Sequence, residues 1–474
     1  MTTAPHAADN AEVTEVDTSA RCALLLLLAF AVLWLVVSGV LALVNLVQLH
    51  TPALLADCSL LTYGRTHALQ ETAFIYGWAA NAGLAVALWI LARLGGSPLR
   101  SLNWVMAGTV FWNLAIALGL VGIATGDGTS NAWLHLPRYV LPMMLVAYGT
   151  IAVPGVLAWS GRRHETAFAA QWYGVAALFL FPWIFSLAQV MLVFVPERGV
   201  LQALVAGWFV QGAWTLWLAP LALTAAYYLV PKLSGRTITS YEFAALSFWT
   251  LLFVGAWTGG RHLIGGPVPA WIPTIAVVSC ALLLFHYIVV ALNLRAAFSG
   301  GGSTVMKFMA LGLGAYVLGG FIDAATALRS VAAFSQFTYF STAQTQLALT
   351  GAFSMLLYGA IYFLAPRITG QPWPSVVLIR AHYAAALTGT VGLVIALAGA
   401  GWIQGHDLRD PLVSFAAIAA HVRPWLLIAT AAQAILLFGN LLLAAHLVRL
   451  IAAKSAAPAA GLFRPAPAME APAS

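Results

Sequence analysis

The sequence predicts an all-α protein that crosses a membrane with twelve helices. Three observations support this prediction: 62% of the 474 residues are hydrophobic and only 7% are charged, the apolar runs are continuous, and basic residues are unevenly distributed between alternate loops. A soluble domain carries about 25% charged residues, so this chain lacks the residues for a water-exposed surface. The composition therefore excludes a soluble enzyme, a nucleic-acid-binding protein and a secreted disulfide scaffold.

The apolar runs are the elements of the predicted fold. Each is long enough to cross about 30 Å of hydrocarbon as a helix. A membrane β-barrel is excluded because apolar and polar residues do not alternate within the runs. The predicted spans are 22–49, 68–94, 103–124, 139–159, 167–195, 203–231, 243–260, 269–294, 306–328, 343–365, 377–403 and 424–451.

The spans form a single predicted membrane domain over residues 21–453. Residues 1–20 are polar and acidic, unlike the basic start of a signal peptide, so we expect a retained N-terminal tail. Residues 454–474 are rich in Ala and Pro and are predicted to be a disordered tail.

The loop charges predict the orientation of the chain. Fourteen of the 21 Lys and Arg residues lie on the side of the predicted loops that holds both termini, and seven lie on the other side. Loops that remain in the cytoplasm carry the excess of basic residues. We therefore expect both termini in the cytoplasm, in agreement with an even number of spans.

Three groups of motifs carry a resemblance to a known family. The motifs are YYLVPK at Tyr227–Lys232 with WTGGRHL at Trp257–Leu263, then SQFT at Ser335–Thr338 with YGAIYFLAPR at Tyr358–Arg367, and finally Tyr63-Gly-Arg65 with Gly77 and Asn81. In this arrangement on twelve spans, the chain resembles the catalytic subunit of cbb3-type cytochrome c oxidase, in the haem–copper oxidase superfamily.

The resemblance implies where metal chemistry belongs in this fold. In the family, one His on span two and one on span ten hold a low-spin haem b. A second His on span ten, two residues earlier, holds the active-site haem. Residues i and i+2 of a helix point about 200° apart, so each imidazole serves a different haem. Copper takes a His from span six and a His-His pair after span seven, where a span-seven Tyr is linked to the span-six ligand.

At the haem positions implied by the resemblance, this sequence carries glutamines. The span-ten pair is Gln344 and Gln346, and the span-two position is Gln70. His67 lies one turn before Gln70. A Gln amide is a weak oxygen donor, whereas haem iron in these roles requires imidazole.

The copper positions are altered as well. The span-six ligand position is Gln211, and the His-His pair is replaced by Arg261 and His262, so His262 alone matches the family. The position of the linked tyrosine is Gly255. A permanently cationic Arg261 would repel a copper ion beside it. We therefore expect no haem b, no copper and no other metal site, and an interior held by hydrogen bonds.

Two acidic residues lie within predicted spans, where ionisable groups are costly and often functional. They are Glu71, and Asp323 one residue after Ile322, which stands where the family carries a glutamate. Arg329 is six residues from Asp323 and cannot pair with it within one helix. Each acid has two open interpretations, a proton or ion path and a buried structural hydrogen bond.

The sequence leaves three functions open and assigns no catalytic residue. The leading hypothesis is a membrane homologue without redox activity, a scaffold or partner subunit of a respiratory-type complex in the inner membrane of a bacterium. Its predicted partners are the lipid bilayer and other membrane subunits, and not nucleic acid. The alternatives are a working haem-containing oxygen or nitric oxide reductase, and a transporter or sensor that uses a polar cavity lined by the substituted glutamines.

Overall fold

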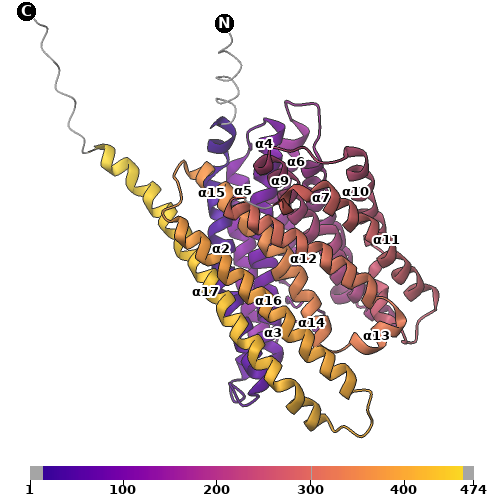
Figure 1. Cartoon of the computed structure of the whole chain (residues 1–474). Helices are drawn as coiled ribbons and strands as arrows, with labels where there is room; N and C mark the ends of the chain where they lie inside the picture. The colour runs from indigo at the N-terminus through magenta and orange to yellow at the C-terminus, as the bar shows by residue number, and fades with distance from the viewer. Residues whose placement is uncertain (1–13, 300–301, 463–474) are drawn as a thin grey trace, which may run out of the picture.

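The computed structural model describes residues 14–299 and 302–462, with side chains up to residue 453. Within these residues the chain is helical and contains no strand. Eleven helices among them are long and apolar enough to cross a membrane (Figure 1). Some of these helices consist of two or three successive elements, which are named together with the bounds of the whole helix. The eleven are α2 Arg21–His50; α3, η2 and α4 Tyr63–Gly95; α5 Leu102–Thr125; α6 Val140–Ser160; α7 and η3 Ala169–Phe194; α8, η4 and α9 Val200–Ser234; α11 Trp271–Asn293; α12 Thr304–Thr326; α14, η7 and α15 Tyr339–Thr369; α16 Val376–Asp407; and α17 Phe415–Leu462.

The segment predicted as span 243–260 differs from the others. It forms α10, Tyr241–Gly255, a helix of 15 residues, followed by a 3₁₀ helix, η5, at Thr258–Leu263. At about 1.5 Å per residue α10 alone is shorter than the hydrocarbon layer. The all-helical membrane fold is confirmed with eleven candidate spans, and the twelfth stays a prediction.

Both ends of the described chain make specific contacts or extend a helix. Helix α17 continues to Leu462, and a disordered tail over residues 454–474 stays a prediction. Alanine has the highest helix propensity, which explains the extension. At the other end, Asp17 accepts a hydrogen bond from the Trp89 indole at 2.8 Å and forms an ion pair with Arg93.

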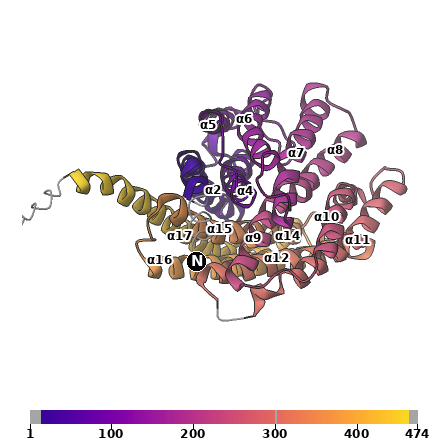
Figure 2. The same ribbon diagram turned by 90° about the horizontal axis from the view of Figure 1, so that it is seen from above.

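Three composite helices form the inside of the bundle. The most apolar stretch of Tyr63–Gly95 is 100% buried, and those of Val200–Ser234 and Tyr339–Thr369 are 94% and 89% buried. The other candidate spans are about half buried, with one face left for lipid. Figure 2 shows α4, α9 and α15, which belong to these three helices, surrounded by the rest. The positions expected to bear metal ligands on spans two, six and ten all lie on these inner helices.

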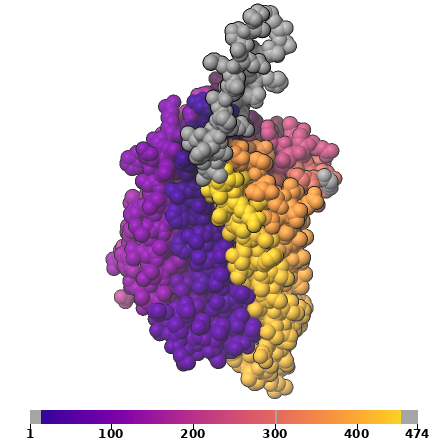
Figure 3. All heavy atoms as spheres, turned by 90° about the vertical axis from the view of Figure 1, so that its left-hand side faces the viewer, coloured from indigo at the N-terminus to yellow at the C-terminus, as the bar shows by residue number. Residues whose placement is uncertain are grey.

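The last two helices pack against the first. Helices α16 and α17 form a long antiparallel pair, and α17 lies along α2 over much of its length (Figure 3). Close approach depends on glycine, since a Cβ atom at Gly389 of α16 would lie 2.6 Å from Leu436 of α17. This packing brings Gln433 and Asn440 of α17 to the side of the inner helices that carries Gln70.

Two adjacent glycines of α12 allow a test of how α12 packs against α11. A Cβ atom at Gly319 would meet only Leu347, at 3.8 Å, whereas one at Gly320 would lie 2.2 Å from the ring of Tyr287. Gly319→Ala should raise the free energy of unfolding by about 0.5 kcal/mol through helix propensity. Gly320→Ala should lower it by about 1–3 kcal/mol through overpacking. Thermal unfolding in one detergent measures both, and equal effects would contradict this arrangement of α12 against α11.

Candidate functional site

Five of the residues singled out from the sequence line one cavity, which we call the polar cavity. It has a volume of about 160 Å³ and lies between α8, η4, η5, α11, α12 and α14. The five residues are Gln211, Arg261, His262, Asp323 and Gln344. Its other lining residues include Trp133, Trp214, Tyr287, Tyr316, Gly319, Ser341 and Thr345.

The remaining two haem positions lie together at a different place. Gln70 and Gln346 line a second cavity between α2, the inner helices and α17, with a volume of about 30 Å³. That space holds about one water molecule. Gln344 and Gln346 therefore face two different cavities, as expected for residues i and i+2 of one helix.

The glutamine-bearing segments share a backbone feature. Gln70 lies three residues before a π-helical segment at Ala73–Ala79, Gln211 two residues before one at Ala213–Leu218, and Gln346 directly before one at Leu347–Ser354. Short π-helical insertions in α-helices are frequent at functional sites because they re-aim side chains. Such an insertion widens one turn, so it changes which face of the inner helix the following residues present.

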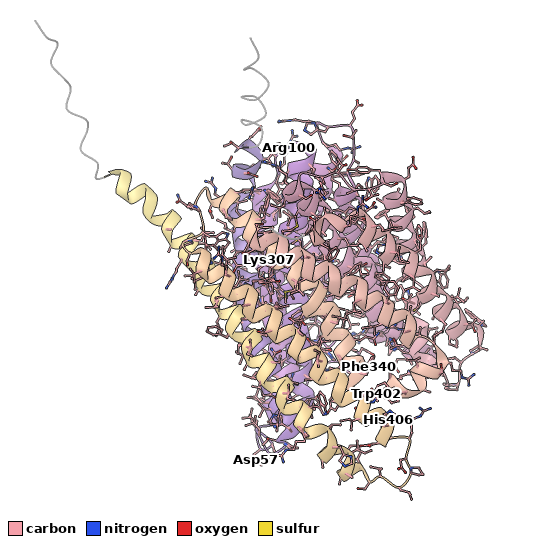
Figure 4. All side chains as sticks on the ribbon, viewed as in Figure 1. Asp57, Arg100, Lys307, Phe340, Trp402 and His406 are labelled. Atoms are coloured by element: carbon pink, nitrogen blue, oxygen red, sulfur yellow. The ribbon has the colours of Figure 1, made fainter. Side chains whose placement is uncertain are left out.

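The helix that carries Gln344 is fixed by its neighbour α16. The Gln404 side chain accepts a hydrogen bond from the backbone N–H of Tyr339 at 2.9 Å. A Cβ atom at Gly401 would lie 2.0 Å from the backbone nitrogen of Phe340, so only glycine permits this approach. Figure 4 shows Phe340 and Trp402 side by side at this contact. The first turn of α14 is thus held before the chain reaches Gln344.

The loop that carries Arg261 and His262 is held against α8. A Cβ atom at Gly259 would lie 2.5 Å from Cα of Trp208, so the glycine lets η5 contact the α8 backbone. At the end of α10, a Cβ atom at Gly255 would lie 3.1 Å from Cβ of Thr215. The position at which the family carries its linked tyrosine therefore leaves little space for an aromatic side chain.

The centre of the polar cavity is an ion pair. The Arg261 guanidinium contacts the Asp323 carboxylate, and the two side chains are only 11% and 18% exposed. Arg261 also donates to the backbone carbonyl of Asp323 at 3.2 Å. Burial lowers the pKa of Arg261, but the facing carboxylate outweighs burial and raises that pKa above its usual value. The guanidinium is therefore always charged, and the carboxylate is its counter-charge.

Gln344 belongs to the same network. Its amide nitrogen donates to Oδ1 of Asp323 at 3.2 Å and to the Thr326 hydroxyl at 3.0 Å. The Gln344 side chain thus holds a carboxylate in place. The partner of that carboxylate is Arg261 of η5, which was predicted from the sequence to stand at a copper position and lies 62 residues away along the chain. No helix spacing could have revealed this partnership.

His262 lies at the edge of the polar cavity and is exposed. Desolvation by the surrounding loop, and then the adjacent Arg261 guanidinium, lower the pKa of His262 to about 4. Its backbone carbonyl accepts a hydrogen bond from the Gln336 side chain. At neutral pH the imidazole is therefore uncharged and contributes no second positive charge to the cavity.

Glu71 lies apart from both cavities. Its carboxylate is 2.8 Å from Nε2 of His135 and 3.6 Å from Nε2 of His67. His135 is also within 3.2 Å of the Thr129 carbonyl. Glu71 thus joins the start of the second span to the 126–138 loop. Glu71 could be identified from the sequence, whereas His135 could not, because no motif links residues 64 positions apart.

Two buried histidines that the sequence left unassigned are hydrogen-bonded within the bundle. The ring of His286 is 2.8 Å from both the Ser247 hydroxyl and the Tyr316 hydroxyl. His382 is 2.9 Å from the Tyr362 hydroxyl. Among the described residues, no group of three or more His, Cys, Asp or Glu side chains is arranged to hold a metal ion.

The residues present do not fit a haem or a copper ion. Cofactor pockets in proteins have volumes of about 300–1,000 Å³, well above the 160 Å³ and 30 Å³ of the two cavities. Most side chains at the predicted ligand positions are amides or a guanidinium, which are poor ligands for iron and copper. In addition, the carboxamide of Gln344 is already bound to Asp323.

Known proteins resemble this chain over most of its length. The family described as Cytochrome C and Quinol oxidase polypeptide I matches residues 23–435. A cytochrome c oxidase subunit 1 of Rhodobacter capsulatus is 24% identical over 393 residues, which cover 78% of this chain and 72% of that protein. The cbb3-type cytochrome c oxidase subunit CcoN1 of Stutzerimonas stutzeri is 24% identical over 389 residues, or 79% and 81% of the two chains.

Solved structures agree at the level of the fold. A haem–copper terminal oxidase dimer contains a chain that superimposes with a TM-score of 0.69 at 13% identity, covering 90% of this chain and 84% of that one. The fold and its inner helices define a multi-pass, all-helical membrane protein. The chain belongs to the cytochrome c and quinol oxidase polypeptide I family, in the haem–copper oxidase subunit I superfamily.

The Arg261–Asp323 pair leads to a stability prediction. Removing one member of a buried ion pair leaves an uncompensated charge, so Asp323→Leu should lower the free energy of unfolding by about 3 kcal/mol. The double variant Arg261→Met/Asp323→Leu should recover most of that loss, because an apolar pair of similar size is nearly neutral. Denaturant or thermal unfolding of the two singles and the double gives the coupling energy. Additive losses would show that the two side chains do not act as a pair.

Proposed function

We propose that this chain is a divergent, redox-silent relative of the cbb3-type catalytic subunit. In this proposal it binds neither haem b nor copper and serves as a scaffold or partner subunit of a respiratory-type complex in a bacterial inner membrane. The observation that carries the proposal is the state of Gln344. In place of an imidazole free to bind iron, the chain has an amide that donates to Asp323 and Thr326.

Three further features support the same proposal. The space between Gln70 and Gln346 is about 30 Å³. The Arg261 guanidinium lies where a copper ligand would stand, and its charge opposes a metal cation. Gly255 contacts Thr215 at the position of the linked tyrosine. Each feature alone could be compensated, but together they remove every part of the metal chemistry while the inner helices remain.

The proposal predicts a protein without haem. The chain, purified from a haem-replete host, should show no stoichiometric haem b in a pyridine haemochrome spectrum and no copper by elemental analysis. The Rhodobacter capsulatus subunit, prepared in parallel, is the positive control. The physical reason is that amide side chains cannot supply the axial nitrogen ligands that a low-spin haem requires. Stoichiometric haem b would overturn the proposal.

A restoration variant separates lost ligands from lost space. Gln70→His/Gln346→His returns both axial imidazoles to the small cavity. We expect this variant to remain substoichiometric in haem, because a cavity of about 30 Å³ cannot hold a porphyrin without rearrangement of α2 and α17. Full haem binding by the variant would show that the missing imidazoles alone make the chain redox-silent.

We also propose that the chain crosses the membrane twelve times with both termini in the cytoplasm. In Figure 1 the beginning of α2 and the end of α17 lie at the same end of the molecule, which requires an even number of crossings. Helix α10 spans about 22 Å, and a short apolar helix can cross where the bilayer thins around it. Figure 4 shows Arg100 toward the cytoplasmic end of this orientation and Asp57 at the opposite end.

The orientation can be tested with the chain's own cysteines. Cys58 lies in the loop beside Asp57, Cys22 lies at the start of α2, and both are free. A membrane-impermeant maleimide added to cells with a permeabilised outer membrane should label the wild type and Cys22→Ser. It should not label Cys58→Ser, because the loop between the first two spans faces the periplasm. Labelling of intact Cys58→Ser cells but not of Cys22→Ser cells would indicate the reverse orientation.

A further inference from the structure

We propose that the polar cavity is a binding site for a small, flat, uncharged molecule that carries both a hydrogen-bond donor and an acceptor, such as an azole or a small carboxamide. The inference rests on the proposed function, since a metal-binding member of the family would use this space for its metals. A ligand site goes beyond the proposed function, because a scaffold does not require a ligand. Four features of the cavity support such a site: the amide of one residue, the hydroxyl of another, the balance of charges and the shape.

The first feature is the side chain of Gln211. This residue is only 7% exposed, and it lines the polar cavity. Within the described part of the chain its amide makes no hydrogen bond, although Gln344 across the cavity makes two. The polar atoms of this amide keep accessible surface at the cavity wall, so their hydrogen-bonding capacity is open to the molecule that occupies the cavity.

The second feature is the hydroxyl of Tyr287. The residue is 3% exposed, and its ring is packed tightly against Gly320. Nothing in the described residues hydrogen-bonds to this hydroxyl, whereas the neighbouring Tyr316 hydroxyl is bound to His286 at 2.8 Å. Because the ring is fixed by Gly320, the hydroxyl is held in place at the cavity wall. Gln211 and Tyr287 together offer a ligand donors and an acceptor.

The charges in the cavity decide which ligands are accepted. Arg261 and Asp323 neutralise each other, and Gln344 holds the carboxylate from the other side. An anion that approached the guanidinium would meet the carboxylate, and a cation that approached the carboxylate would meet the guanidinium. Breaking the pair to bind either ion would leave one buried charge without compensation. The site therefore favours uncharged molecules.

The shape of the cavity limits the size and form of the ligand. Aromatic side chains form much of its wall, and one of them, Trp133, is held by a hydrogen bond from the Tyr76 hydroxyl to its carbonyl. A volume of about 160 Å³ holds about five water molecules, or one molecule of roughly five to ten non-hydrogen atoms. Aromatic walls favour a flat ring that can stack on them. Exposed His262 and Ser341 mark the opening of the cavity.

Imidazole is a suitable probe, because it is flat, has five ring atoms and carries one donor and one acceptor. At about pH 8.5 it is uncharged. Thiophene, a ring of the same size without a strong donor or acceptor, is the matched control ligand. With the full chain in lipid nanodiscs, saturation-transfer NMR and the shift in thermal midpoint should show saturable imidazole binding. Thiophene should bind about a hundredfold more weakly, the equivalent of two unmade hydrogen bonds.

Variants place the binding in the polar cavity. Gln211→Leu and Tyr287→Phe should each weaken imidazole binding about tenfold, because each removes one hydrogen bond. Gln202→Leu, a change of the same type on α8 that does not line the cavity, should leave the affinity unchanged. Unfolding midpoints without the probe should show that all three variants remain folded.

The outcomes are distinguishable. Absence of saturable binding to a metal-free wild-type chain would overturn this inference and leave the proposed function standing. Equal affinity in Gln211→Leu and the wild type would also overturn it, since the probe would then bind elsewhere. Stoichiometric haem b in the purified chain would overturn the proposed function itself, whatever imidazole does. Binding of imidazole and thiophene with equal affinity would indicate an apolar void and not a polar site.

Discussion

The interior of this protein depends on the buried pair between Arg261 and Asp323. A guanidinium is always charged, so its placement inside a bundle requires a fixed counter-charge and further hydrogen bonds. Asp323 supplies the charge, and Gln344 supplies a hydrogen bond that holds the carboxylate. The consequence extends beyond stability. A site balanced in this way has no spare charge to attract a metal cation.

The family scaffold explains how such a pair can lie in the interior without loss of the fold. Tyr63–Gly95, Val200–Ser234 and Tyr339–Thr369 are packed on all sides, and each contains a π-helical segment close to a substituted position. Glycine contacts such as Gly401 against Phe340 position these helices. Side chains at the proposed ligand positions can therefore differ while the backbone that carries them stays in place.

Much of the fold could be predicted from the sequence, since long apolar runs and loop charges report on the bilayer directly. The opposite facing of Gln344 and Gln346 also followed from helix geometry. The side-chain partners of the two acidic residues could not be predicted, because they depend on contacts between segments that are distant in the sequence. The Arg261 partner of Asp323 and the His135 partner of Glu71 come from other elements, and no spacing rule reaches them.

The polar cavity and the small cavity differ in how completely side chains fill them. Around Gln70 and Gln346 only about 30 Å³ remains, as expected when packing alone determines the space. Around Gln211 a larger space persists, with an unpaired amide and an unpaired hydroxyl held at its wall. Close packing would remove such a space at little cost, since Gly319 and Ala348 leave room for larger side chains. Its persistence, beside a charge pair that excludes ions, is better explained by a ligand that fills it than by an incomplete collapse.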